Sequence, residues 1–257
     1  MYRWETLAQD LGVAPVEEPM TEKYYLGAYW PGRVEPVASY ARRGEAFFGL
    51  LASIDPTFNR WFEKGGSRAN ALRSPFVPDQ ASLLGLFQQK YRRDEEGVSF
   101  SAWNGEPDGA SSGVRLSCGS TSALVGDLCV LDLPARGDVS ERVLTAAVLS
   151  RALRAAALAW DADWGVATSM AHRDKVSELA VPGTFVGWVM YLSARRGAVP
   201  PLPAPVRMEP VEDKGTLIVL TPERFTAANP EHVSLAERVS GLLDRAGLLK
   251  PVQPATP

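Results

Sequence analysis

Cysteine, histidine and excess basic charge are all scarce in this sequence of 257 residues. The two cysteines, Cys118 and Cys129, are too few for a disulfide-based fold and are typical of a reducing compartment. The two histidines, His172 and His232, lie far from each other and from the cysteines, so the clustered ligands of a zinc site are missing. The formal net charge of −3 argues against a broad basic face for nucleic acid.

The sequence also has no long apolar run and no recognisable phosphate-binding loop. A membrane helix needs roughly 20 apolar residues, and the opening stretch, MYRWETLAQDLG, lacks the pattern of a secretory signal. Neither GxxxxGKS nor GxGxxG occurs, and the glycine-rich stretch 105–113 is typical of a hairpin loop. The content of 46% hydrophobic and 22% charged residues is that of a globular protein, which we expect to be cytoplasmic.

Aromatic residues and alternation of apolar residues with serine predict strands in the first half of the chain. These predicted strands are 24–30, 97–105, 112–119 and 128–134. Helical spacing of apolar residues predicts one helix that stops before Asp55, a short helix near Leu83, and a long third helix. We expect Asp138 to cap this long helix and Trp160 to end its apolar stripe.

The second half repeats this order of elements. Its predicted strands are 164–169, 185–193, 207–211 and 216–221. A short helix is predicted over 169–179, and a closing helix starts at Asn229-Pro230 and ends at Gly247.

Each half therefore has the order strand, helix, three strands, helix. This order predicts an α+β fold of two pseudo-repeated halves, with a mainly antiparallel sheet packed by helices. The halves comprise about residues 23–160 and 161–249 of a single domain spanning 23–249. Residues 1–22 form a polar lead-in, and we expect residues 250–257 to be a disordered tail.

The stretch WDADWG (160–165) is the first candidate for chemistry. Asp161 and Asp163 have the D-x-D spacing that holds a divalent cation in many enzymes, but further carboxylates and a phosphate loop do not accompany them. The alternative is a polar turn between a helix that ends at Trp160 and a strand that starts at Trp164. We favour the turn, and we expect no bound metal and no other cofactor.

A nucleophilic residue is the second candidate. Cys118, with His172 and an aspartate, has the residue types of a hydrolase. Cys118 lies in phase with Val114 and Leu116, however, which predicts a buried, protonated thiol. The serines near Ser120 lack the GxSxG turn that exposes a nucleophile. We therefore expect no catalytic residues.

Acidic and aromatic residues predict a protein-binding surface instead. The acidic cluster 94–96 precedes a predicted strand, although a solvated loop is the plain alternative. Trp103 lies out of phase with the apolar residues of that strand, so we expect it to face outwards, as tryptophans of binding hot spots do. The predicted partner-binding residues are Asp94, Glu95, Glu96, Trp103, Asp161 and Asp163.

The order of motifs between residues 24 and 247 resembles the immunity protein 52 family of bacterial polymorphic toxin systems. The motifs that carry the resemblance are LGAYWPGR (26–33), DPTFNRWFEKGGSRANAL (55–72), SFSAWNG (99–105), SCGS (117–120), WDADWG with VATS (160–169) and GTFVGWVMYLS (183–193). Their order along the chain, more than any single motif, supports the resemblance. It carries no assignment of interface residues.

This resemblance implies a non-enzymatic immunity protein. Members are antidotes of nuclease toxins with a restriction-endonuclease-like fold, often delivered by type VI secretion. The implied partner is such a toxin, encoded by an adjacent gene. We expect neither direct binding of nucleic acid nor association with a membrane. Two alternatives stay open from the residues: a small hydrolase or metal-dependent enzyme using Asp161 and Asp163 or Cys118, and a secretion adaptor.

Overall fold

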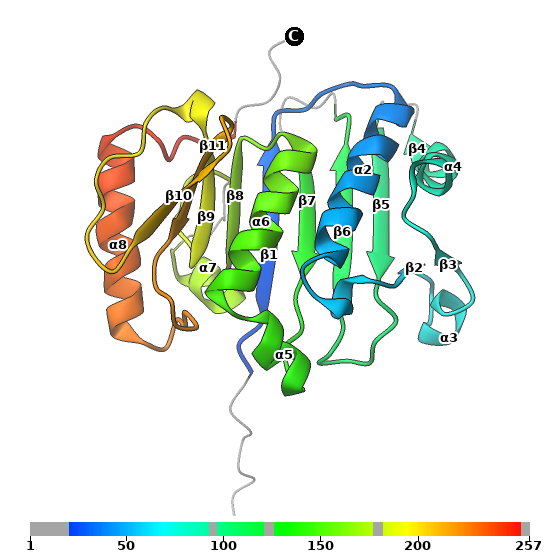
Figure 1. Cartoon of the computed structure of the whole chain (residues 1–257), viewed down its shortest axis with the longest axis horizontal. Coiled ribbons are helices and arrows are strands. Elements are labelled where there is room, and N and C mark those ends of the chain that lie inside the picture. The colour runs from blue at the N-terminus through cyan, green and yellow to red at the C-terminus, as the bar shows by residue number, and fades with distance from the viewer. Residues whose placement is uncertain (1–20, 93–96, 121–125, 177–181, 253–257) are drawn as a thin grey trace, which may run out of the picture.

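The computed structural model describes residues 21–92, 97–120, 126–176 and 182–252, and all strands in these ranges join one antiparallel sheet (Figure 1). The predicted α+β class is confirmed. The strands are β1 (Tyr24–Trp30), β2 (Trp61–Glu63), β3 (Pro75–Phe76), β4 (Tyr91–Arg92), β5 (Gly97–Trp103), β6 (Gly113–Cys118), β7 (Asp127–Asp132), β8 (Trp164–Ser169), β9 (Val189–Ser193), β10 (Arg207–Val211) and β11 (Gly215–Val219). Their order is β10-β11-β9-β8-β1-β7-β6-β5-β2-β3, with β4 paired to β5.

The helices α2 and α6 lie side by side across the centre of one face of this sheet, while α8 lies at one end of the sheet and α3 and α4 lie at the other (Figure 1). The α-helices are α2 (Val37–Ala52), α3 (Arg68–Ala71), α4 (Gln80–Lys90), α5 (Gly137–Val143), α6 (Ala146–Trp160), α7 (Met170–Val176) and α8 (Pro230–Arg245). Two 3-10 helices, η1 (Pro56–Phe58) and η2 (Ala194–Arg196), complete the described elements.

The first strand, β1, is the centre of the sheet. It pairs with β7 on one side and with β8 on the other, so Leu26 lies between Leu131 and Ala167. The ring of Tyr29 lies over Gly27 and leaves no room for a side chain there, because a Cβ would lie 2.5 Å from the Tyr29 hydroxyl oxygen. The central strand thus joins the two halves of the chain in one core.

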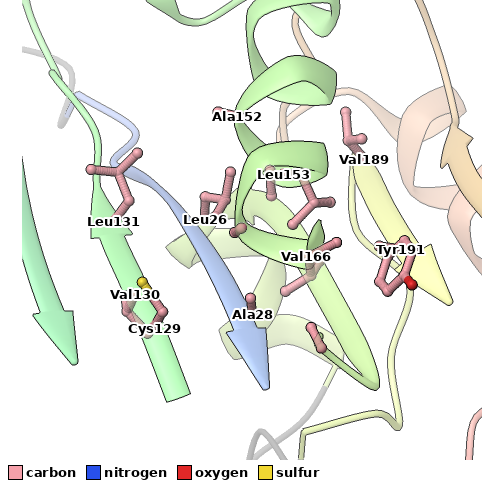
Figure 2. Packing of buried hydrophobic residues seen from close by; sticks show 14 of the residues in the cluster. Leu26, Ala28, Cys129, Val130, Leu131, Ala152, Leu153, Val166, Val189 and Tyr191 are labelled. Atoms are coloured by element: carbon pink, nitrogen blue, oxygen red, sulfur yellow. The ribbon is translucent and has the colours of Figure 1, made fainter. Parts of the chain in front are cut away.

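Small residues let α6 lie close to the sheet. Ala152 and Ala156 are fully buried, and Leu153 packs over Gly165 of β8. Figure 2 shows side chains of β1, β7, β8 and β9 gathered under this helix. Trp160, at its last turn, and Trp188 are both buried, as the sequence predicts.

The prediction of one long helix that starts at Asp138 is wrong. The structure divides this segment into two helices, α5 and α6, with an angle of 71° between them. Leu144 leaves helical geometry (ψ 65°), and the Thr145 side chain accepts a hydrogen bond from Val148 N at 3.3 Å. Thr145 is therefore the cap of α6, and Asp138 only lies in the first turn of α5. A threonine hydroxyl competes for backbone donors and favours such a helix start.

The two halves arrange their strands differently. In the first half the order is β1-β7-β6-β5, so the first strand lies beside the last; in the second half it is β8-β9-β11-β10. The division into two repeated halves stays a prediction. Residues 1–20 and 253–257 lie outside the described residues, whereas Val252 donates its N–H to Pro182 O at 2.9 Å.

Asp55, before which the sequence predicts the end of the helix observed as α2, has a further role. The Asp55 carboxylate, which is buried, accepts Thr57 N at 2.9 Å and so caps η1. Arg142 of α5 donates Nε to Asp55 Oδ2 at 2.7 Å and Nη2 to Oδ1 at 3.1 Å. This two-pronged ion pair ties α5 to the end of α2.

We expect this ion pair to make stability depend on acid. Burial raises the pKa of Asp55, but the hydrogen bonds from Arg142 and Thr57 outweigh it and hold the pKa at about 2. A depressed carboxyl pKa stabilises the fold above the unfolded value of 3.8, and the contribution is lost as pH falls toward about 2. Because Arg142 is half exposed, Asp55→Asn is expected to cost about 1–2 kcal/mol near neutral pH.

The measurement is urea unfolding of the parent and of Asp55→Asn near neutral pH and at about pH 3. The difference in free energy of unfolding should shrink in acid. An equal difference at both pH values would mean that the charge of Asp55 contributes nothing.

Candidate binding surface

The WDADWG stretch forms the corner between α6 and β8. Asp161 adopts the left-handed conformation (φ 49°, ψ 51°) that ends α6, and Asp163 donates its N–H to Tyr29 O at 2.9 Å. Trp160 and Trp164 are buried on either side of the corner. The stretch is thus the polar turn that the sequence favours.

Cations of the same chain surround both aspartates. Asp161 Oδ2 lies 3.3 Å from Arg33 Nη1 and 3.2 Å from Arg195 Nη1. Asp163 Oδ2 lies 2.8 Å from Arg196 Nη2, and its Oδ1 accepts the Ser193 hydroxyl at 2.9 Å. The described ranges contain no group of three or more His, Cys, Asp or Glu side chains that could hold a metal ion.

Cys118 and His172 lie in different parts of the molecule. Cys118 is buried on β6, and burial raises its pKa well above the ordinary value. His172 is buried on α7 beside β8, where its Nε2 lies 2.9 Å from Val186 O. Strands β7 and β1 separate β6 from β8, so these two residues do not form a nucleophile and base pair.

Among the described residues, one face of β5 and β6 is exposed and is called the open face here. Phe100 of β5 points toward α4, where it meets the ring of Phe87, so the residues that alternate with it point the other way. On that other face Ser99 and Arg115 are exposed, and Trp103 is half-buried. Because their backbones pair in register, these side chains form a continuous surface.

The same face of the second half is covered. Phe185 packs edge-on against Trp164 of β8 at 5.1 Å between ring centroids. Arg173 of α7 lies over the ring of Tyr25 at 5.6 Å. The open face therefore ends near β1.

A groove with a volume of about 970 Å³ lies at the Trp103 end of the open face. Its lining comes from α3 and the segment before it, from β5, β6 and the loop between them, from the ends of β7 and β1, and from the start of α7. The Trp103 ring meets Phe62 at 6.1 Å between centroids, and the Arg68 guanidinium lies 5.8 Å from the Trp103 centroid. An aromatic anchor with an arginine beside it is typical of binding surfaces.

Charged side chains in the groove are mostly basic. Arg115 Nη2 pairs with Asp132 Oδ1 at 3.0 Å, and both side chains are substantially exposed. Glu106 and Asp108 are the other lining carboxylates. The lining cations are Lys23, Lys64, Arg68, Arg115 and Arg136, all exposed.

The structure separates the predicted partner-binding residues. Trp103 lies in the groove, next to Gly113 of β6 at the strand ends near Tyr25. Asp161 and Asp163 lie at the opposite strand ends, near Tyr29. The predicted cluster of Asp94, Glu95 and Glu96 lies outside the described residues.

Sequence reasoning missed the basic lining of the groove. Arg115 alternates with the buried Val114 and Leu116, a pattern that marks it as outward-facing. Lys64 and Arg68 have no such periodic signal, because Lys64 lies between β2 and α3 and Arg68 begins the four-residue helix α3. Only the pairing of β2 with β5 brings them beside Trp103.

No single helix in the described parts of the chain is long and apolar enough to cross a membrane. The helices α5 and α6 meet that test only together, as a pair bent by 71°.

The fold and groove define an α+β protein with one open sheet face and a recessed surface. The chain belongs to the Immunity protein 52 family, whose sequence profile matches residues 22–252. This match confirms the family resemblance seen in the order of the motifs.

A comparison with curated proteins finds no match. Among solved structures, a Pseudomonas aeruginosa T6SS protein is similar, with a TM-score of 0.58 and 13% sequence identity. The alignment covers 98% of this chain and 86% of that one, and at this identity it shows a shared fold.

Proposed function

We propose that this protein is a cytoplasmic antidote that binds and neutralises a nuclease-type toxin by covering its nucleic-acid-binding surface. Family membership supports the immunity role. The structural observation that carries the proposal is the open sheet face with its groove around Trp103. The proposed partner has a restriction-endonuclease-like fold and is the product of an adjacent gene. The T6SS neighbour supports delivery of this toxin by type VI secretion.

A non-enzymatic mechanism is part of the proposal. The thiol of Cys118 is buried with a raised pKa, which disfavours the reactive thiolate. Asp161 and Asp163 are engaged by Arg33, Arg195 and Arg196 rather than free to bind a metal ion. Protection by binding requires an affinity of about nanomolar or better over an interface of roughly 1,600 Å² or more.

The acidic residues have a distinct proposed role. Asp94, Glu95 and Glu96 would attract the basic surface with which a nuclease holds phosphate, so they should mainly raise the association rate. Asp161 and Asp163 belong to the same proposal. Because both carboxylates already form ion pairs within the chain, a basic partner gains less binding free energy from them.

Truncation of Trp103 to alanine is expected to weaken toxin binding by about 2 kcal/mol or more, mainly through faster dissociation. Neutralisation of 94–96 is expected to slow association instead, and high salt should remove that difference. The measurement is a kinetic binding series with the toxin encoded by the adjacent gene. Met208→Ala is the matched control, because Met208 is an exposed apolar side chain on the far edge strand β10.

Unchanged kinetics in both folded variants would place the interface elsewhere on the protein. Failure of the parent protein to bind the adjacent toxin would overturn the proposed function itself.

A further inference from the structure

We propose that the groove around Trp103 receives an acidic segment of the toxin, with an apolar side chain seated against the Trp103 ring. The inference rests on the proposed function and specifies the chemistry of the partner at this site. Two regions of the toxin with opposite charge would then contact this protein. A basic surface would meet the carboxylates at 94–96, and an acidic segment would lie in the groove.

The sign of the charge in the groove is the first argument. The whole chain has a formal net charge of −3, yet the groove lining has five cations and three carboxylates. One of the carboxylates, Asp132, is already paired with Arg115. A surface of local positive charge on an acidic protein attracts acidic segments and repels basic ones.

The availability of these cations is the second argument. Lys23, Lys64 and Arg136 are exposed and form no ion pair with any described residue. Arg68 is also exposed: its Nη2 lies 3.4 Å from Gly105 O, and its guanidinium stays over Trp103. These four side chains retain donors for incoming carboxylates, and arginine binds a carboxylate with two parallel hydrogen bonds.

The aromatic floor is the third argument. Trp103 is half-buried, and Phe62 supports its ring from the neighbouring strand. Arg60 lies 5.5 Å from the centroid of Phe62, so both rings of this floor have a guanidinium beside them. A partner side chain placed on Trp103 would therefore bury apolar area while its flanking carboxylates meet Arg68 and Lys64.

A single nucleic-acid strand also combines negative charge with stacking. The groove disfavours it, because Glu106 and Asp108 are exposed in the lining and would repel continuous phosphates. A protein segment can place its carboxylates at separate points and avoid these two positions. The observations thus favour an acidic protein segment.

The main experiment reverses charge in the groove. In Lys64→Glu/Arg68→Glu the affinity for the adjacent-gene toxin is expected to fall roughly tenfold or more, with a smaller effect at high salt. Folding should persist, since both side chains are exposed and a glutamate suits the first turn of α3. Arg42→Glu/Arg238→Glu is the matched control, because it makes the same charge change on the exposed faces of α2 and α8.

Two peptide probes test the groove without the toxin. An eight-residue peptide of alternating glutamate and leucine should shift the Trp103 indole NMR signal, which Trp103→Phe identifies by its loss. The lysine and leucine counterpart should leave the signal unchanged. An oligothymidine of similar length serves as the nucleic-acid probe.

A toxin that binds the parent and the groove variant equally would overturn the inference and leave the proposed function standing. A stronger response to the basic peptide or to oligothymidine, lost in Lys64→Glu/Arg68→Glu, would also overturn it. Absence of toxin binding by the parent would remove the proposed function, and the peptide result would then decide the charge preference of the groove alone.

Discussion

Replacing Trp160 by alanine is expected to lower the free energy of unfolding by about 3–5 kcal/mol. The Trp160 side chain is buried at the end of α6 and stacks on Trp30 with 5.4 Å between ring centroids and 3° between the ring planes. Phe47 of α2 meets the same ring at 6.3 Å. The substitution would leave a cavity where α2, α6 and β1 meet, and close-packed surroundings relax only partly into such a space.

Trp160→Phe is the matched control. It keeps an aromatic ring against Trp30 and leaves a much smaller cavity than alanine does, so its loss of stability should be clearly smaller. Urea unfolding followed by circular dichroism measures both variants. An alanine variant as stable as the parent would contradict the placement of Trp160 in the core.

Loss of the Asp127 carboxylate should have an effect of similar size, about 3–4 kcal/mol for Asp127→Ala. Asp127 is buried, and its Oδ2 accepts Trp30 Nε1 at 3.0 Å, Arg33 N at 3.1 Å and Gly119 N at 3.0 Å. Its Oδ1 accepts Ser120 N at 2.9 Å. Burial raises the pKa of Asp127, whereas these four donors favour the carboxylate.

Without the Asp127 carboxylate, four N–H groups at the junction of β1, β6 and β7 would lose their acceptor. Asp127→Asn retains one side-chain oxygen and should destabilise the fold less than alanine does. Equilibrium unfolding of the two variants tests this order. If alanine proved equal to asparagine, the hydrogen bonds to Asp127 would not be what holds the junction together.

Local patterns in the sequence were sufficient for most long elements. Alternation of Val98, Phe100 and Ala102 predicted β5, and all three are buried. Asn229 and Pro230 marked the start of α8, where the Asn229 side chain accepts Glu231 N at 2.9 Å. Such signals act over one or two turns and depend on nothing else in the chain.

Other features depended on distant residues. The short strands β2, β3 and β4 have two or three residues each, too few for a periodic pattern. Strand order was also beyond local patterns, because β1 pairs with β7 and β8, which are separated from it in the sequence by several helices and strands. Expected strand 185–193 begins only at Val189, although the preceding Phe185 and Val186 are buried.

The candidate site shows the same limit. The phase of β5 predicted that Trp103 points away from Phe100, and the structure agrees. Its cationic neighbours come from four separate segments, before β1, after β2, in β6 and after β7. No spacing in the sequence joins Lys23, Lys64, Arg115 and Arg136, and only the register of the sheet brings them to one groove.

Inhibition of the adjacent-gene toxin's nuclease activity tests the central claim most directly. Increasing amounts of the purified protein would be added to a fixed amount of toxin nuclease domain, and cleavage of DNA or RNA would be followed. We predict that cleavage falls to background at about one equivalent, as expected for an affinity near nanomolar, and that Trp103→Ala requires an excess. Undiminished cleavage in the presence of excess folded protein would contradict the account.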